Sequence, residues 1–300
     1  MRDKVMISVI MPVYNGQDWL HDSIGSILSQ DFSNYEIIIV NDGSTDNSAE
    51  ILNEYAANHS NIRVFNNKNS GPGNSLNFGI QQAQGKYLCF IDQDDMYDSK
   101  YLSSMYAAIE KSDADLCMCY GRTFENATGH TERLRFPYIE TGIISDKYGL
   151  LDCFYPQWTK IIKRDFILQH DIKFPLRHNP VHDVPFHILT VYFAKKIFIL
   201  NAELYRHRVH SGQITHNLIS FAKKGNIISL QDIESYYKTH PSAGRELMQF
   251  ALGLMNFRGN FWQKLTIKRF RLKYNLKSEI IRIFYKKSYD DKFCRTRILC

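Results

Sequence analysis

The stretch KYLCFIDQDD, Lys86–Asp95, combines a short apolar run with three carboxylates in four consecutive positions. An apolar run of about five residues bounded by a polar turn is typical of a buried strand. Asp92, Asp94 and Asp95 would repel one another at its end unless a cation or hydrogen-bond donors offset their charge. The stretch therefore predicts a buried strand whose carboxyl end carries a binding site.

Apolar strands and amphipathic helices alternate in the residues that precede this stretch. Expected strands are 5–13 (VMISVIMPV), the apolar start of 35–48 (YEIIIVNDGSTDNS) and 61–67 (NIRVFNN), and expected helices lie within 14–32, 49–59 and 76–84. Asp18 or Asn15 is the expected N-cap of the first helix. This alternation predicts an α/β fold built from βαβ units around a mainly parallel sheet.

Polar residues follow three of the expected strands, at Tyr14–Asn15, Asn41–Ser44 and Asp92–Asp95. In open parallel sheets, ligands bind outside the carboxyl ends of the strands, so these clusters are expected to form one site. The chain has no GxGxxG after its first strand and no Walker GxxxxGK[ST], which removes the main support for a dinucleotide or P-loop site. Gly71–Gly73 is a weaker signal, equally compatible with a plain turn, and the acidic stretch lacks the glycine and twelfth-position glutamate of an EF-hand.

The composition is that of a globular protein, with 300 residues, 44% hydrophobic and 23% charged. No run of about twenty apolar residues suggests a transmembrane helix. The six cysteines lack zinc-site spacing, and buried free thiols in a reducing cytoplasm are expected. Of the net charge of +6, residues 261–300 carry twelve Lys and Arg against three Asp and Glu. No nucleic-acid recognition motif accompanies this charge.

Six segments together resemble the family 2 glycosyltransferases, inverting enzymes of the GT-A fold that use nucleotide-activated sugars. The segments are SVIMPVYNG (8–16), IIIVNDGSTDNS (37–48), NSGPGNSLNFGI (69–80), GKYLCFIDQDD (85–95), VHDVPFHI (181–188) and YRHRVHSGQIT (205–215). They occur in the family's order. The resemblance implies a GT-A domain over residues 1–215.

The resemblance implies a nucleotide-sugar site in the N-terminal part of the chain. Pro12, Val13 and Tyr14 would line the base pocket, and Asp42 would accept a hydrogen bond from the imide N–H of uracil. Asp92 would reach the ribose or a metal-bound water, and Asp95 the donor sugar. The remaining residues expected to bind the nucleotide-sugar are Asn15, Gly71, Asn77, Gln93 and Arg208.

Metal and proton chemistry also follow from the resemblance. Asp94 of the DXD motif, with His210 as a second candidate ligand, would bind Mn²⁺ or Mg²⁺ and so neutralise the leaving diphosphate. Asp183 would remove the proton from the acceptor hydroxyl. A carboxylate at a helix start is also compatible with ordinary capping.

Three positions depart from the family pattern or leave a role open. His182 replaces the usual Glu and either pairs with Asp183 or lies at the surface, and Leu76 replaces a common Arg. Trp158, in FYPQWTKIIKRDFI, is expected either to stack on a sugar or to pack in the core. The QxxRW signature of processive synthases is absent, which favours transfer of a single sugar.

Residues 216–300 are expected to form a helical, basic C-terminal region. Its stretch 256–288 interleaves aromatic and aliphatic residues with Lys and Arg, a pattern typical of helices on anionic membrane surfaces and also of a helical subdomain with a basic face.

The sequence therefore predicts transfer of a hexose or N-acetylhexosamine from a UDP-sugar to a glycan acceptor, free or lipid-linked, in cell-surface polysaccharide or lipooligosaccharide synthesis. The protein would be cytoplasmic, in part on the inner face of the plasma membrane. The alternatives are a non-catalytic nucleotide-sugar-binding module and a sugar-nucleotide pyrophosphorylase, although the latter would need a basic, glycine-rich loop where this chain has YNGQDW (14–19).

Overall fold

The structure is a computed structural model that describes most of the chain up to residue 210. The described residues are 4–126, 128–134, 139–145, 147–150, 156–176, 182–210, 231–236, 238–240 and 247. The strands are β1 Ile7–Val13, β2 Tyr35–Asn41, β3 Ile62–Asn66, β4 Tyr87–Phe90, β5 Met96–Tyr97, β6 Leu116–Phe124, β7 Thr131–Arg133, β8 Gly142–Ile143, β9 Lys160–Lys163 and β10 Ile197–Arg208. The helices are α1 Leu20–Leu28, α2 Ser48–Asn58, α3 Pro72–Gln82, α4 Tyr101–Ser112, α5 Arg164–Gln169 and α6 Asp183–Phe193, with short 3₁₀ turns η1 Lys147–Leu150 and η2 Gln157–Thr159.

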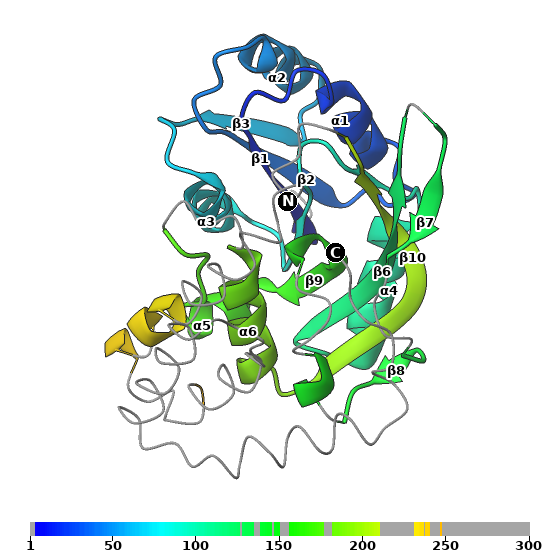
Figure 1. Cartoon of the computed structure of the whole chain (residues 1–300), viewed down its shortest axis with the longest axis vertical. Helices are drawn as coiled ribbons and strands as arrows, with labels where there is room; N and C mark the ends of the chain where they lie inside the picture. Colours follow the sequence, from blue (N-terminus) through cyan, green and yellow to red (C-terminus); the bar gives the residue numbers. More distant parts are fainter. Residues whose placement is uncertain are drawn as a thin grey trace, which may run out of the picture.

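One mixed sheet with the strand order β3-β2-β1-β4-β9-β6-β10-β5 runs through the molecule (Figure 1). The first four of these strands are parallel, as the sequence predicts, because each crosses over through a helix. Strand β9 then pairs antiparallel with both β4 and β6, and β10 runs parallel to β6. The α/β prediction is confirmed, and the antiparallel insertion of β9 is an addition to it.

Alternate residues of the central strands feed two apolar layers, one on each face of the sheet. In β1, Val9 and Met11 belong to the layer covered by α1, α2 and α4, whereas Ile10 belongs to the layer covered by α3, α5 and α6. This period of two within continuously apolar strands is what a parallel sheet buried on both faces requires. Cys89, Cys117 and Cys119 are buried free thiols within these layers.

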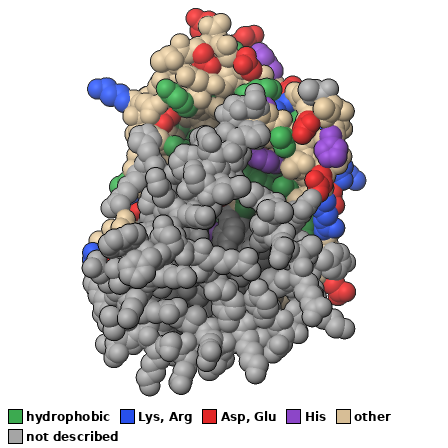
Figure 2. Space-filling view, in the orientation of Figure 1, with side chains coloured by type: hydrophobic (Ala, Val, Ile, Leu, Met, Phe, Trp, Pro, Cys, Tyr) green, Lys and Arg blue, Asp and Glu red, His purple; other side chains and the backbone are tan. Residues whose placement is uncertain are grey.

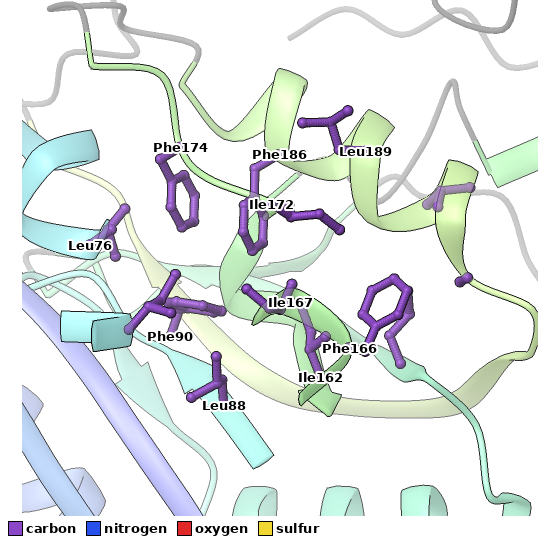
Figure 3. Packing of buried hydrophobic residues seen from close by; sticks show 14 of the residues in the cluster. Leu76, Leu88, Phe90, Ile162, Phe166, Ile167, Ile172, Phe174, Phe186 and Leu189 are labelled. Carbon is purple, nitrogen blue, oxygen red and sulfur yellow. The ribbon is translucent and has the colours of Figure 1, made fainter. Parts of the chain in front are cut away.

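Aromatic stacking joins α6 to the sheet (Figure 3). The rings of Phe174 and Phe186 stack with centroids 3.9 Å apart, and both meet the ring of Phe90 edge-on at 5.6 and 5.7 Å. Leu76 of α3 lies beside this cluster and is fully buried. Leu76, which replaces the common Arg of the family, is therefore a core residue in this chain.

The first helix starts differently from the sequence prediction. Trp19 occupies the N-cap position of α1 and makes no side-chain cap, and the main-chain oxygen of Gly16 accepts hydrogen bonds from the N–H groups of Trp19 and Leu20. The prediction of Asp18 or Asn15 as the N-cap is thus wrong, because a tight turn at Gly16 satisfies the first N–H groups with a main-chain carbonyl.

The described part of the C-terminal region packs against the sheet domain. Residues 231–236 are helical, Ile233 and Leu247 are buried in the layer of α5 and α6, and the Tyr236 hydroxyl donates to the main-chain oxygen of His170. The basic stretch 256–288 lies outside the described residues, so the expected membrane-surface helix stays a prediction. Among the helices that the structure describes, none has the length and hydrophobicity to cross a membrane.

The surface of the N-terminal layers is acidic in places. In Figure 2 acidic side chains gather at the upper end of the molecule, where α2 lies in Figure 1. Helix α2 carries two exposed acidic residues, Glu50 and Glu54.

Candidate donor site at the carboxyl edge of the sheet

The loops that follow β1, β2 and β4 meet at one edge of the sheet. The Asp42 N–H donates to the main-chain oxygen of Val13, and the Gln93 side chain contacts the main chain of Tyr14. The predicted convergence of three polar clusters is therefore present. The end of β10 joins them from the other side, because Arg208 donates to the main-chain oxygen of Asp94.

The loop after β1 presents one exposed aromatic ring. Tyr14 is 46% exposed, whereas Val13 is 1% exposed and packs in the core. Pro12 is half-buried. Among the three residues expected at the base pocket, only Tyr14 presents a largely exposed side chain, and the side chain of Val13 points into the apolar layer instead.

Asn15 joins the loops after β1 and β2. It has a φ of 51°, and its side-chain oxygen accepts hydrogen bonds from the Thr45 N–H at 2.8 Å and the Thr45 hydroxyl at 3.3 Å. The Asn15 N–H donates to the Ser44 hydroxyl. Asn15 therefore supports the loop geometry, and asparagine suits a left-handed position better than most residues.

Asp42 is buried and contacts the glycine loop before α3. Its carboxylate accepts hydrogen bonds from the main-chain N–H groups of Ser70 at 2.9 Å and Gly71 at 2.8 Å. Gly71 has a φ of 91°, which an L side chain rarely adopts, so its glycine is required by the turn. The structure assigns Asp42 a role in fixing this loop, beside the uracil contact that the resemblance implies.

Asn77 fixes the segment that leads towards α6. Its side-chain amide donates to the main-chain oxygen of Phe174 and accepts from the Phe174 N–H, both at 2.9 Å. Asn77 is 8% exposed, so its side chain lies inside the domain. The expectation that Asn77 binds the nucleotide-sugar is not supported by this geometry, and Asn77 instead links α3 to the segment around Phe174.

Asp92 is the first carboxylate of the acidic loop, which we define as residues 92–95. It accepts a hydrogen bond from the Gln157 side chain at 3.1 Å. Burial and the neighbouring charges of Asp95 and Asp94 raise its pKa well above the ordinary value. Such a carboxylate is ionised more readily when a cation or donor approaches, as expected at a cation-binding site.

Asp94 lies next to His210, its predicted partner in metal binding. One carboxylate oxygen is 3.0 Å from His210 Nε2, and both side chains are about one-fifth exposed. Burial and the charge of Asp95 raise the pKa of Asp94, while the hydrogen bond with His210 acts in the opposite direction. The indole of Trp19 lies against the His210 ring, with centroids 4.8 Å apart.

Asp95, the last residue of the acidic loop, is fully buried. Its carboxylate accepts hydrogen bonds from the Tyr205 hydroxyl at 2.7 Å and the Arg208 N–H at 2.8 Å, and it pairs with His207 Nδ1 at 3.1 Å. The expectation that Asp95 reaches the donor sugar is not supported, because its oxygens face β10. Asp95 anchors the acidic loop to that strand.

Arg208 is also buried and supports the loop from below. Its guanidinium donates to the main-chain oxygen of Asp94 and to Asp22, and it lies over the rings of Trp19 and Phe124. Its exposed fraction is 1%. The expected phosphate contact of Arg208 is therefore not supported, since these contacts place its charge inside the fold.

His207 is the charged partner that the sequence pattern did not reveal. Burial opposes its protonation, but the carboxylates of Asp95, Asp94 and Asp92 outweigh burial and raise its pKa to about 9. His207 stacks on Trp158, which is 6% exposed and stacks in turn on Tyr205. Trp158 therefore packs in the core, the second of the two roles left open for it.

His207 and Gln157 both contact the acidic loop, but only His207 could have been assigned to it from a sequence pattern. His207 is two positions from Tyr205, so the period of two of a strand, had one been expected there, would have placed both on one face. Gln157 has no such pattern. Its contact with Asp92 depends on β9 and η2 lying next to β4.

Asp183 is the first residue of α6, as predicted, and is half-buried. Its charge contributes to the raised pKa of Asp92, which places the two carboxylates within electrostatic reach. The preceding residue, His182, is half-buried beside the ring of Phe174. The start of α6 therefore faces the same edge of the sheet as the acidic loop.

The residues that could bind a divalent cation are Asp94 and His210. Within the described residues, no three His, Cys, Asp or Glu side chains cluster in a way that could bind a metal. Mg²⁺ and similar cations commonly use one or two protein carboxylates together with substrate phosphates and water. A carboxylate and an imidazole 3.0 Å apart therefore fit a cation that completes its coordination with phosphate oxygens.

Comparison with known proteins shows which family the chain belongs to. The sequence model described as Glycosyl transferase family 2 matches residues 8–170. The chain is 33% identical over 220 residues to the uncharacterized glycosyltransferase YibD of Escherichia coli, an alignment that covers 70% of this chain and 63% of that protein. The chain belongs to glycosyl transferase family 2. It spans less than two thirds of the length of this relative.

Solved structures share the fold. The crystal structure of S. aureus TarS 1-349 in complex with UDP-GlcNAc has a TM-score of 0.70 and 18% identity, covering 95% of this chain and 88% of that chain. The mannosyltransferase PcManGT from Pyrobaculum calidifontis, in complex with GDP-Man and Mn²⁺, has a TM-score of 0.58 and 14% identity, with 95% and 88% coverage. The GT-A fold expected from the resemblance is thus confirmed.

Proposed function

We propose that the protein is an inverting glycosyltransferase that moves a hexose or N-acetylhexosamine from a UDP-sugar to a glycan acceptor, free or lipid-linked. The observation that carries this proposal is the position of Asp94 and His210, 3.0 Å apart, on the same edge of the sheet as the exposed Tyr14. The UDP-GlcNAc in the TarS complex supports the choice of a uridine donor.

The donor would lie across the carboxyl ends of β1, β2 and β4. The Tyr14 ring, which is exposed, would stack on the base, and Asp92 would contact the ribose. Asp94 and His210 would bind Mn²⁺ or Mg²⁺, which neutralises negative charge on the leaving diphosphate when it is bound. Mn²⁺ in the PcManGT complex supports this use of a divalent cation.

Asp183 would act as the general base. It would accept the proton of the acceptor hydroxyl while that oxygen forms a bond to C1 of the sugar. The bond between C1 and the diphosphate oxygen would break on the opposite face, so the anomeric configuration inverts. The position of Asp183 at the start of α6, within the electrostatic reach of Asp92, supports this assignment.

The first test is the binding of nucleotides and nucleotide-sugars, measured by thermal stability with Mn²⁺ and with EDTA. We expect the largest stabilisation with uridine nucleotides, and only when the cation is present. Asp94→Asn should remove the cation-dependent part. Asp113→Asn is the matched control, because the Asp113 side chain is 81% exposed and pairs with Lys163. The absence of any shift with uridine nucleotides would overturn the proposed donor.

A second part of the proposal concerns residues 216–300, in which the basic stretch 256–288 would dock on an anionic membrane surface. The alternation of aromatic residues with Lys and Arg supports it. Flotation with vesicles that contain anionic lipid should recover the protein, and vesicles of neutral lipid alone should not. Equal recovery with both would contradict the proposed docking.

A further inference from the structure

The main chain of Tyr14 lies at a gap between two strands. Register pairs join β1 to β4 from Ile7 through Ile10, and the last main-chain hydrogen bond between them runs from the Ile91 N–H to the Ile10 oxygen. Beyond that point β4 gives way to the acidic loop, so no strand of the described chain accompanies Tyr14 on that side. A main-chain N–H and C=O in such a position need partners from elsewhere.

The side chain of Gln93 supplies both partners. Its Oε1 accepts a hydrogen bond from the Tyr14 N–H at 2.7 Å, and its Nε2 donates to the Tyr14 oxygen at 3.1 Å. A side-chain amide carries one acceptor and one donor group in the arrangement of a peptide group. Gln93 thus pairs with the main chain of Tyr14 beyond the last β1–β4 register pair at Ile10, with a side chain in place of a strand.

Gly16 is shaped to receive this side chain. A Cβ at position 16 would lie 2.6 Å from Gln93 Oε1 and 2.8 Å from its Cδ, and its three nearest atoms all belong to Gln93. Gly16 is not among the described glycines with a positive φ, so alanine is compatible with its main chain. Gly16 is also fixed, because its N–H donates to the Ser48 hydroxyl and its oxygen accepts from Trp19 and Leu20. The glycine therefore serves the contact with Gln93.

We propose that Gln93 is a positioning residue that fixes the main chain of Tyr14 and thereby orients the exposed ring for the base of the donor. This inference rests on the proposed function, because it assumes that Tyr14 meets a nucleoside. The resemblance implies that Gln93 binds the nucleotide-sugar itself. The structure assigns it instead to the protein side of the site, between Asp92 and Asp94 in sequence and against Tyr14 in space.

A double-mutant cycle tests the proposal. The variants are Gln93→Ala, Gly16→Ala and the combination of both, with UDP affinity measured calorimetrically in the presence of Mn²⁺. Each single variant should weaken UDP binding about tenfold, the loss expected when two hydrogen bonds that preorganise a site are removed. The double variant should be no weaker than Gln93→Ala, because the alanine methyl at position 16 then meets no Gln93 side chain.

Two further measurements distinguish the proposed role of Gln93 from a general loosening of the acidic loop. They are the affinity for uridine and the steady-state kinetic constants. Uridine has no phosphate, so its affinity, followed by NMR titration, should fall by the same factor as that of UDP. The KM for the donor should rise while kcat at saturation stays within about twofold. Thermal melts of all variants confirm folding, since the methyl group added by Gly16→Ala displaces a flexible side chain and costs little stability.

The outcomes separate the two levels of inference. If wild-type protein binds no uridine nucleotide, the proposed function fails. If wild-type protein binds UDP and Gln93→Ala binds it equally well, or if the two single effects add in the double variant, the role of Gln93 is wrong. A loss confined to UDP with Mn²⁺, with uridine affinity unchanged, would also overturn it, because Gln93 would then act on the acidic loop alone.

Discussion

The loop after β2 and the acidic loop after β4 stabilise their carboxylates by different means. Asp42 and Asp46 accept hydrogen bonds from main-chain N–H groups of nearby segments. The acidic loop instead depends on the side chains of His207 and His210, more than a hundred positions away in the sequence. In the first loop the donors are mainly main-chain N–H groups, and in the second they include side chains of a distant strand.

The pKa shifts follow this difference. Burial opposes ionisation of Asp46, but hydrogen bonds from Ser48 and Gln17 outweigh it, and the pKa of Asp46 is lowered. In the acidic loop, burial and mutual repulsion raise the pKa of Asp92 and Asp94. The loop after β2 is thus stable with its charge, whereas the acidic loop gains from an added cation, which is the property a cation-dependent site needs.

The largest expected effect is on kcat, and it distinguishes a catalytic carboxylate, Asp183, from a structural one, Asp46. Asp183→Asn should lower kcat by about 10²- to 10⁴-fold, the contribution typical of a general base, while UDP affinity stays unchanged. Asp46→Asn, in the loop after β2, should leave kcat within about threefold, because the contacts of Asp46 are structural. Steady-state transfer assays and UDP titrations check both. An Asp183→Asn variant with wild-type kcat would refute the assigned base.

Stability should also distinguish the two loops. Asp95→Ala removes the acceptor for Tyr205, His207 and the Arg208 N–H at a fully buried position, so the free energy of unfolding should fall by about 3–5 kcal/mol. Asp46→Ala should cost about 1 kcal/mol, since it removes hydrogen bonds near the surface. Urea denaturation measures both. Equal losses would mean that the contacts of Asp95 are no more important for stability than those of Asp46.

The stabilisation that His207 gives to the fold should change with pH in the opposite direction to that from Asp46. The pKa of His207 is raised to about 9 from an ordinary value of 6.5, so the stabilisation from its charge is complete below about pH 6.5 and is lost as pH rises through about 9. The difference in unfolding free energy between wild type and His207→Gln should shrink over that window by on the order of 3 kcal/mol. Asp46 acts oppositely: its lowered pKa gives a stabilisation present above about pH 4 and lost as pH falls further.

The control for this prediction is the profile of His207→Gln itself. Glutamine can still donate to Asp95 but carries no charge, so its unfolding free energy should lack the decline between about pH 6.5 and 9. Parallel profiles for wild type and variant would show that His207 is not charged in the folded protein.

The smallest expected effect concerns the turn at Asn15. Asn15→Ala should lower the free energy of unfolding by about 1–2 kcal/mol, because it removes the bonds to Thr45 and places alanine at a φ of 51°. Asn15→Gly removes the same bonds without the backbone strain and should lose about 1 kcal/mol less. Chemical denaturation of the pair measures the difference. If alanine and glycine are equivalent, the left-handed turn contributes nothing.

The loop after β2 was more predictable from the sequence than the acidic loop. The strands β1 to β4, the helices between them and the meeting of their loops all follow from apolar periods and turn residues close together in the chain. The helix expected at 76–84 starts too late, since α3 begins at Pro72, where proline is favoured in a first helical turn.

The roles within the acidic loop were less predictable. The pattern places Asp92, Asp94 and Asp95 together but does not say which would face a ligand, because that depends on β10. Because side chains alternate between the two faces of β10, Tyr205 and His207 both point towards Asp95. The antiparallel strand β9 brings Gln157 to Asp92. The charge of Arg208 suggests a phosphate contact, and only the rings of Trp19 and Phe124 beside it show why it is buried.

Strand β10 has one consequence for sequence change in this protein. Its register against β6 shifts between Leu200 and Glu203 and again between Glu203 and Tyr205. These irregularities set which residues of the following segment face Asp95. Deleting a single residue there would exchange the two faces of the strand and turn Arg206, now paired with Asp98, towards the buried carboxylate. A one-residue deletion in 201–204 should therefore be far less tolerated than one at the exposed residues 128–130, between β6 and β7.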